Sequence, residues 1–400
     1  MGAALTYGGT VAAGVGWDSA DIARNWPGLP PLAGDATADA CVVGLGGSGL
    51  AAIDALLDRG LSVIGLDAGR VAAGAAGRNG GILSGGGAMS LASGANGVSR
   101  ADKIALYFDS DAELRHLEER LGSAVVQRVP LYRIAGFVRG PRDEAERKIE
   151  AAHLDDLRAG AAVMREAGIP VEDYEGELGR GLRLPNRGRV NPAVRALELA
   201  TQCRTRGAVL HENTRVTGLE AGAVHTGQGS VRARVVVVAV DGKLDVLLPQ
   251  LAGAVRTVRL QMIATAPLSR RVLDGVLGCR DGFEWMQQDD GGRLLIGGGR
   301  DQYEADENTV DDHPTEQVQR WIDQQAERAA GEPVTVTHRW AASVGYTTDR
   351  RALCVPVHDQ MIAVGGYSGS GNLVGPLAAR TAVARLLDGT TIPGYFRSEI

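Results

Sequence analysis

A chain of 400 residues is long enough for two domains, since a single hydrophobic core rarely extends beyond about 250–300 residues. The hydrophobic content of 44% and charged content of 22% are those of a globular protein that buries a large core. The net charge of -6 is spread along the chain. It gives no electrostatic reason to expect a nucleic acid or an anionic membrane as partner.

Cysteine and histidine spacing argues against metal or disulfide frameworks. The four cysteines are far apart and include no C-x-x-C pair, and the seven histidines form no H-x-x-x-H pair. We therefore expect no metal site and a reducing, cytoplasmic location. No apolar run approaches the roughly 18 residues of a transmembrane helix, so no membrane span is predicted.

The first elements predict a β–turn–α–β unit. Residues 1–38 are rich in Gly, Pro and Asp without periodicity, and we expect an irregular arm. A buried strand at 40–45, a helix at 49–59 and a second strand at 61–66 follow. This unit is the core of a doubly wound fold.

The remainder of the chain mixes helices with short β-like runs. Helices are predicted at 102–121, 142–167, 192–206 and 315–330, and strands at 208–211, 214–219 and 231–240. Short runs with turn glycines at 255–267 and 282–298 indicate an antiparallel sheet. The segment 361–387 has the pattern strand, glycine-rich turn, helix.

A glycine motif joins the first strand to the first helix, with the sequence Gly44-Leu45-Gly46-Gly47-Ser48-Gly49. Its glycines permit a tight turn, close approach of a pyrophosphate and close helix–strand packing, while the helix N-terminus offers free N–H groups to phosphates. Asp67, at the end of the second strand, is placed to bind ribose hydroxyls. The motif predicts a dinucleotide and leaves NAD and FAD both open.

Two further segments favour a flavin. After Asp67 the chain reads Ala68-Gly69-Arg70 and then Ala75-Ala76-Gly77-Arg78-Asn79-Gly80-Gly81, small residues that can pass flat against an extended ligand. Near the end, residues 365–372 (GGYSGSGN) precede a helix whose N-terminus could stabilise negative charge on a reduced flavin. A surface loop and a glycine turn without ligand are the alternatives for these two segments.

Several blocks in this order resemble the D-amino-acid-oxidase-type FAD oxidoreductases, the superfamily of glycine oxidase and sarcosine oxidase, and within it the gamma-glutamylputrescine oxidase-like branch. The blocks are LDAGRVAAGAAGRNGG at 66–81, GRVNPAVRALELATQCRTRGAVLHENTRV at 188–216, GRLLIGGGRDQY at 292–303, WAASVGYTTDRRALCVPV at 340–357 and GGYSGSGN at 365–372. The resemblance implies an α/β fold. A discontinuous Rossmann-type FAD-binding domain would comprise 1–105, 188–252 and 336–400. An α+β substrate domain on an antiparallel sheet would comprise 106–187 and 253–335.

The resemblance also implies which residues hold FAD. The glycine motif would hold the pyrophosphate, Asp67 the adenosine ribose and Val216 the adenine. The residues expected at the cofactor are Gly44, Gly46, Gly47, Ser48, Gly49, Asp67, Ala68, Arg70, Arg78, Asn79, Gly80, Gly81, Ile82, Val216, Gly369, Ser370, Gly371, Asn372 and Leu373.

The sequence departs from the sarcosine-oxidase-like pattern near the flavin. The strand at Leu294–Gly297 lacks the lysine that such enzymes use toward oxygen, and Asn372-Leu373 stands where they have a lysine for the substrate carboxylate. Ala342 stands where they have the cysteine that binds flavin covalently. We therefore expect non-covalent FAD, and oxygen or another electron acceptor.

The expected activity is oxidation of a C–N bond in a small-molecule amine or amino acid to the imine, by hydride transfer to flavin N5. The pocket candidates are Gln261, Met262, Trp285, Trp340 and Tyr367, with ordinary core packing as the alternative for each. Arg300 and His338 are polar candidates. Two other functions remain open: an FAD enzyme acting on a non-amine bond, and a flavin-binding protein without redox activity. The sequence does not indicate the oligomeric state.

Overall fold

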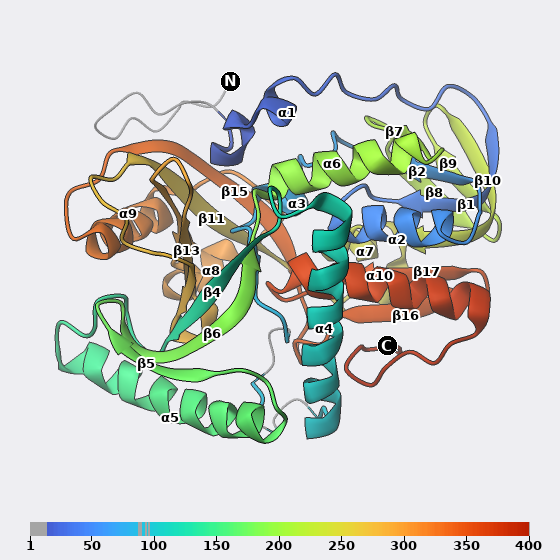
Figure 1. Cartoon of the computed structure of the whole chain (residues 1–400). Helices are drawn as coiled ribbons and strands as arrows, with labels where there is room; N and C mark the ends of the chain where they lie inside the picture. Colours follow the sequence, from blue (N-terminus) through green and yellow to red (C-terminus); the bar gives the residue numbers. More distant parts are fainter. Residues whose placement is uncertain (1–13, 87–89, 93, 95–96, 400) are drawn as a thin grey trace.

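The structure is a computed structural model that describes residues 14–86, 90–92, 94 and 97–399. It contains two large β-sheets flanked by helices (Figure 1). The predicted α/β architecture is confirmed. Part of the arm predicted at 1–38 lies outside the described residues. Among the helices that the structure describes, none combines the length and the apolar character needed to span a bilayer.

The first sheet is mostly parallel and is assembled from segments far apart in the sequence. In spatial order its main strands are β16 (Leu353–His358), β17 (Met361–Gly365), β10 (Gly229–Val238), β1 (Ala36–Val43), β2 (Val63–Leu66) and β7 (Val209–His211). Only β16 is antiparallel to its neighbour along this path. The hairpin of β8 (Val216–Glu220) and β9 (Ala223–Thr226) extends β10. The strand–helix–strand unit predicted around the glycine motif is therefore present.

Strand β10 illustrates why these strands are apolar on both sides. Val235 and Val237 pack into the core beneath the helices on one face, whereas Val236 and Val238 pack on the other face with Leu244. The helices on the first face are α2 (Gly47–Leu57), α4 (Arg100–Leu121), α6 (Pro192–Thr205) and α10 (Gly371–Asp388). Burial on both faces is what a parallel sheet requires.

Helix α6 begins where the sequence predicts. The Asn191 side chain accepts hydrogen bonds from the N–H groups of Ala193 and Val194, and Pro192 occupies the first turn, where its missing N–H costs nothing. This start fixes the direction of α6 along α2, so that the side chain of Arg195 reaches the glycine motif.

The second sheet is antiparallel except for one pair of strands. In spatial order its strands are β15 (Val336–Tyr346), β11 (Arg256–Pro267), β14 (Arg293–Gly298), β13 (Glu284–Gln288), β12 (Val276–Cys279), β4 (Gln127–Ile134), β6 (Gly179–Arg189) and β3 (Ile82–Leu83), with β5 (Glu172–Gly176) beside β6. Strands β12 and β4 form the parallel pair. Because β15 pairs with β11, its hydrogen bonds place residues 336–346 in this sheet. The domain boundaries therefore remain a prediction.

Two helices pack on opposite faces of the second sheet, and α4 stands between the two halves (Figure 1). Helix α9 (Glu316–Ala330) packs Val318 and Ile322 against the sheet, and α5 (Glu144–Glu166) packs Ala161 and Met164 against β4 and β6. The opposite face of β11, β14 and β15 meets Trp17. The cofactor side of the sheet is therefore the face without α9.

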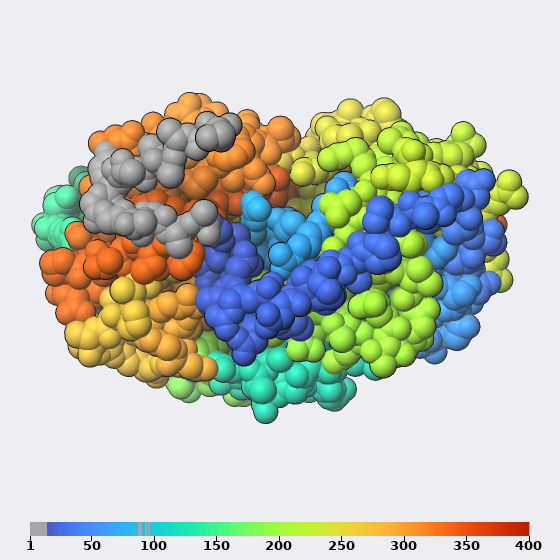
Figure 2. Space-filling model, turned by 90° about the horizontal axis from the view of Figure 1, so that it is seen from above, coloured from blue at the N-terminus to red at the C-terminus, as the bar shows by residue number. Residues whose placement is uncertain are grey.

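The N-terminal arm crosses between the two sheets. It contains the short helices η1 (Gly16–Ser19) and α1 (Asp21–Arg24). Trp17 packs on the second sheet, whereas the Trp26 indole donates to Glu212 at 2.9 Å and the Leu32 N–H donates to Thr214 at 3.0 Å beside the first sheet. Figure 2 shows this segment, in dark blue, running over the surface of the molecule.

Candidate functional site

A cavity of about 690 Å³ opens at the carboxyl ends of β1 and β2. We call it the first cavity. Its lining includes the glycine motif, Asp67, the segment 72–79, Val216 and the turn before α10. Ligands of doubly wound sheets bind at this edge. The structure therefore brings together, around one space, segments separated by 328 residues in the sequence (372 minus 44).

The motif glycines differ in what lies around them. A Cβ on Gly49 would lie 1.8 Å from the carbonyl oxygen of Gly44, which itself has φ +99°. These two positions therefore need glycine because of the protein backbone. A Cβ on Gly46 or Gly47 would meet no protein atom closer than 3.5 Å or 3.7 Å. These two glycines border the open cavity and leave room for a phosphate.

Asp67, at the end of β2, is partly exposed to the first cavity and is held by two backbone N–H groups. Its Oδ2 accepts from Leu45 at 2.7 Å and its Oδ1 from Gly69 at 2.8 Å. Burial raises the pKa of the Asp67 carboxyl, and the two hydrogen bonds oppose that rise. Each oxygen can still accept a second bond from the cavity, so the position suits a ribose hydroxyl.

The segment 75–82 runs between the two sheets. Its polar side chains mostly form hydrogen bonds within the protein that fix the backbone of the segment. The Asn79 Oδ1 accepts from the Gly81 N–H at 2.8 Å and from the Asn372 amide at 2.9 Å, and the Asn79 Nδ2 donates to the Ala75 carbonyl at 2.9 Å. Arg78 donates to the Ala341 carbonyl at 3.1 Å. Asn79 therefore holds the segment and does not offer a free amide to a ligand.

Asn372 is similarly occupied. Its Nδ2 donates to Asn79 and, at 3.1 Å, to the Ile82 carbonyl, while its Oδ1 accepts from Arg195 at 3.0 Å. The three residues join α6, the turn before α10 and the segment 75–82. At the position of the substrate-binding lysine of sarcosine-oxidase-like enzymes, this chain thus has a structural link.

Arg195 was missed by the sequence prediction, although it lines the first cavity. It is 3% exposed, and its Nε and Nη2 have no hydrogen-bond partner among the described residues. Burial lowers the pKa of Arg195 to about 10, an effect opposed by nearby Glu113. A buried guanidinium with unused N–H groups beside the helix N-terminus calls for an anion. The first cavity therefore fits the pyrophosphate of a dinucleotide.

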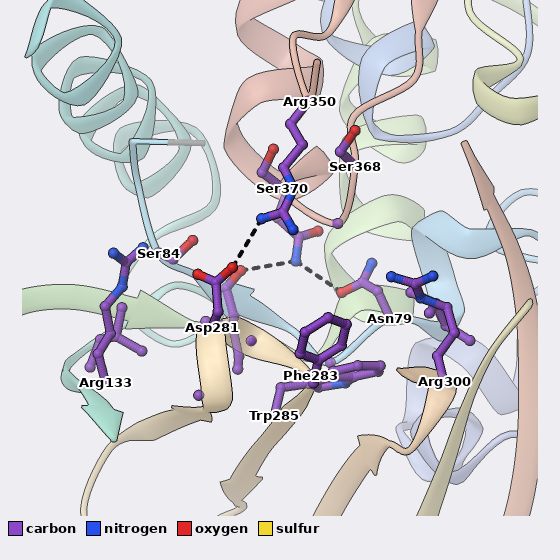
Figure 3. Close-up of a pocket in the computed structure, with 18 of the residues that line it drawn as sticks. Asn79, Ser84, Arg133, Asp281, Phe283, Trp285, Arg300, Arg350, Ser368 and Ser370 are labelled. Carbon is purple, nitrogen blue, oxygen red and sulfur yellow. Dashed lines mark hydrogen bonds and ion pairs between the residues drawn. The ribbon is translucent and has the colours of Figure 1, made fainter. Parts of the chain in front are cut away.

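A second cavity, of about 520 Å³, adjoins the first and lies over the cofactor side of the second sheet. The two cavities share lining residues, namely Ala75, Arg78, Asn79, Leu260, Ala342, Val344, Gly369 and Asn372. Aromatic walls are supplied by Phe283 and Trp285 (Figure 3) and by Tyr346. A ligand that fills the first cavity would thus present one end to the second.

One row of the second sheet forms the floor of this second cavity. The register joins Arg133 to Gly278, Gly278 to Trp285, Trp285 to Gly297 and Gly297 to Met262. Residues so paired on neighbouring strands point to the same face. A Cβ on Gly297 would lie 2.5 Å from the Trp285 ring and 2.7 Å from Met262, so this glycine lets the two side chains meet.

Two of the five predicted pocket residues, Trp285 and Met262, line the second cavity, and the other three do not. Gln261 precedes Met262 on β11 and faces away, where its amide donates to Glu307 at 2.9 Å and Thr315 at 2.7 Å. Trp340 packs with Trp17, and its indole donates to the Arg78 carbonyl at 2.8 Å.

Tyr367 lines the first cavity instead and is packed in the core of the first sheet. Its hydroxyl has no hydrogen-bond partner among the described residues, and burial raises its pKa. Of the two polar candidates, Arg300 lines the second cavity, and His338 interacts with Thr337 outside it. Aromatic residues can be read from sequence as pocket candidates, but the face on which they lie cannot.

The strand that lacks the lysine has an apolar side toward the cofactor. Leu295 is fully buried and packs with Trp17, Met262 and Trp340. Ile296 points to the opposite face, toward α9. The arm therefore covers the region where sarcosine-oxidase-like enzymes have a cation.

The second cavity has polar groups that the sequence prediction missed. Arg133, Asp281 and Arg350 line it, and Arg350 pairs with Asp281 at 3.1 Å across the cavity (Figure 3). Asp281 has φ +58° and Arg350 has φ +61°, conformations that non-glycine residues rarely adopt. Arg133 lies on β4, Asp281 in the short helix η4 (Arg280–Gly282) and Arg350 in a loop, and no local motif marks them, so only the tertiary structure could have located them.

Comparisons with known proteins agree with this geometry. The family model described as "DAO: FAD dependent oxidoreductase" matches residues 39–385. The chain is 27% identical to "Probable oxidoreductase OrdL" of Rhizobium meliloti (strain 1021), with 98% of this chain and 94% of that protein covered. It is 26% identical to gamma-glutamylputrescine oxidoreductase of Escherichia coli (strain K12), with 88% and 84% covered. The crystal structure of glycine oxidase from Geobacillus kaustophilus has a TM-score of 0.72 at 20% identity, covering 89% of this chain and 96% of that one.

Proposed function

Because the chain belongs to the DAO family of FAD-dependent oxidoreductases, an enzyme family, we propose that it oxidises a C–N bond in an amine or amino acid to the imine. FAD is its cofactor. The observation that supports the reaction is the junction of the two cavities, where a redox group in the first would face an aromatic-walled space large enough for a small organic substrate.

The first cavity supplies the groups that would hold the cofactor. The N-terminus of α2 and the Arg195 guanidinium would bind the pyrophosphate, and Asp67 would bind the ribose. Ala342 lines both cavities in place of a cysteine, so no thiolate is present there to form a covalent flavin bond. We therefore propose non-covalent binding.

When bound, FAD accepts a hydride equivalent from the carbon next to the nitrogen. The residues of the chain position that carbon. Trp285 packs on Gly80, where an added Cβ would lie 2.4 Å from the indole, and so fixes the wall of the second cavity beside the segment 75–82. Burial raises the pKa of Tyr346, which favours the neutral phenol in the wall of the cavity. We propose that the amine reacts in its neutral form and that the cavity orients it.

The residues around strand β14 bear on which electron acceptor the enzyme uses. The strand Leu294–Gly297 has no lysine and presents the apolar Leu295 on this face, while Arg78 and Arg300 are among the charged groups in the lining of the second cavity. We propose that oxygen or another acceptor reoxidises the reduced enzyme. Which of them does so is decided by how fast each reacts with the reduced flavin. Measuring peroxide after readmission of air distinguishes the two.

Anaerobic reduction of the flavin tests the proposal. Purified holoenzyme is mixed with amines, N-methyl amino acids and D-amino acids, and the flavin absorbance is followed by stopped flow. Bleaching by an amine and not by matched alcohols supports C–N oxidation. Bleaching by alcohols alone would contradict it, and flavin that only dithionite reduces would indicate a binding protein without redox activity.

A further inference from the structure

Arg133 is a cation that lines the second cavity without a counter-ion. It lies on β4, and its guanidinium forms no ion pair or hydrogen bond with any residue that the structure describes. Arg133 is half-buried, and its surroundings are mixed: Leu131 and Leu182 on the sheet and Leu157 and Met164 on α5 are apolar, whereas Ser84 is polar and uncharged (Figure 3). A guanidinium kept in such surroundings is stabilised by an anion that comes from outside the chain.

The remaining charges of the cavity do not neutralise Arg133. The lining contains four arginines, Arg78, Arg133, Arg300 and Arg350, and two aspartates, Asp156 and Asp281. Asp281 is already paired with Arg350. Asp156 is exposed and accepts from the Ser90 hydroxyl at 3.2 Å. Arg78 pairs with Asp312 at 3.1 Å and Arg300 with Glu304 at 3.7 Å, both carboxylates lying outside the lining. Among the described residues, Arg133 is therefore the lining arginine without a paired carboxylate, which favours a substrate with a negative charge.

The sheet register places Arg133 away from the cofactor end of the cavity. Arg133 and Trp285 lie on the same face, on strands separated by β12, so that roughly 10 Å separates their strands. Figure 3 shows Arg133 and Asn79 on opposite sides of the cavity, with Asp281 between them. An anionic group at Arg133 is thus remote from the reacting bond.

Glycine keeps the path between the two ends open. Gly278, between Arg133 and Trp285, would place a Cβ no closer than 3.9 Å to any atom, the Glu284 carbonyl oxygen. The Trp285 ring leans the other way, over Gly297. The floor beside Arg133 is therefore free for an extended carbon chain.

We propose that Arg133 binds a terminal carboxylate of the substrate, which is an amine whose carboxylate is separated from the reacting carbon by several methylene groups. This inference deepens the proposed function and rests on it. In an α-amino acid the carboxylate is attached to the reacting carbon and cannot occupy the Arg133 end while that carbon lies beside Trp285. Arg133 is in this respect a specificity-determining residue.

Binding without turnover gives the first test. The FAD holoenzyme is titrated with hexanoate and with uncharged hexanamide, and the perturbation of the flavin absorbance is followed. We expect hexanoate to bind at least about 10-fold more tightly, and Arg133→Met to remove that preference. Arg133→Lys should restore part of it. Arg128→Met is the matched control, because Arg128 lies on the same strand and pairs with Glu118 at 2.8 Å outside the cavity.

Turnover gives the second test, with 6-aminohexanoate, 6-aminohexanamide, hexylamine, 1,5-diaminopentane and alanine as substrates. We expect the lowest KM for 6-aminohexanoate, and a KM about 10- to 100-fold higher with unchanged kcat in Arg133→Met, the pattern of lost uniform binding. Equal affinity for hexanoate and hexanamide, equal use of alanine, or no effect of Arg133→Met overturns the proposal. If no amine reduces the flavin while hexanoate still binds through Arg133, the proposed C–N oxidation is contradicted, but binding of an anion by Arg133 is supported.

Discussion

The two cavities are built in opposite ways. The first owes its shape to backbone: in the turn from Gly44 to Gly49, a side chain at Gly44 or Gly49 would collide with backbone, and one at Gly46 or Gly47 would enter the cavity. The second owes its shape to side chains such as Trp285, Met262 and Arg133, which meet only because their strands pair in one register. A backbone site can be recognised in a short stretch of sequence, whereas a side-chain site depends on contacts that no short stretch contains.

The largest effect is expected where the backbone site tolerates no side chain. Gly49→Ala places a methyl group 1.8 Å from the Gly44 carbonyl oxygen, so α2 must move away from β1. We expect a loss of about 3 kcal/mol or more of stability, together with loss of bound FAD. Thermal unfolding and the flavin-to-protein absorbance ratio measure both. Gly227→Ala is the control, since its methyl would meet no atom within 4 Å. Normal FAD content in Gly49→Ala would show that the turn is not required.

A smaller loss of stability is expected from a change at Leu295, where the second sheet faces the cofactor. Leu295→Lys restores the residue type of sarcosine-oxidase-like enzymes, but it buries an ammonium among Trp17, Met262 and Trp340. We expect a loss of stability of roughly 2–4 kcal/mol, whereas Leu295→Met should cost under about 1.5 kcal/mol. Denaturant unfolding of both holoenzymes measures the difference. A stable Leu295→Lys variant that reacts faster with oxygen would show that the site accepts the cation.

The smallest effect is expected for Arg195, which lines the first cavity beside the glycine motif. Arg195→Met removes the proposed partner of the pyrophosphate, and we expect the Kd for FAD to rise about 10- to 100-fold. In the apoprotein, loss of the 3.0 Å hydrogen bond from Arg195 to Asn372 opposes the gain from removing a buried guanidinium without a full set of partners, so we expect stability to change by less than about 1 kcal/mol. FAD titration and unfolding of the apoprotein separate the two effects. An apoprotein destabilised by more than this would instead indicate a purely structural role for Arg195.

The same contrast explains what the sequence could predict. The elements around the first cavity followed from local patterns: β1, α2 and β2 from the glycine motif, and α6 from Asn191 and Pro192. Strands β4 and β6 were missed, because arginine, glycine and proline interrupt their apolar alternation and pairing with each other stabilises them instead.

The site residues likewise divide into those that local sequence could predict and those that depend on the packed structure. Trp285 and Met262 could be named as pocket candidates from residue type, but Gln261, adjacent to Met262, faces α9 because neighbouring residues of a strand point to opposite faces. Arg133, Asp281 and Arg350 had no local signal. Arg195 lay within a recognised block, yet its isolation from any carboxylate partner is a property of the packed structure alone.

The N-terminal arm constrains the order of events during protein synthesis. Trp17 leaves the ribosome early, but its partner Trp340 is made 323 residues later (340 minus 17). At about 5–20 residues per second, this interval lasts roughly 15–65 s. Throughout it the indole of Trp17 has no Trp340 to pack against. A nascent chain stalled before residue 340 should therefore expose the arm to a protease that no longer cuts it once translation is complete.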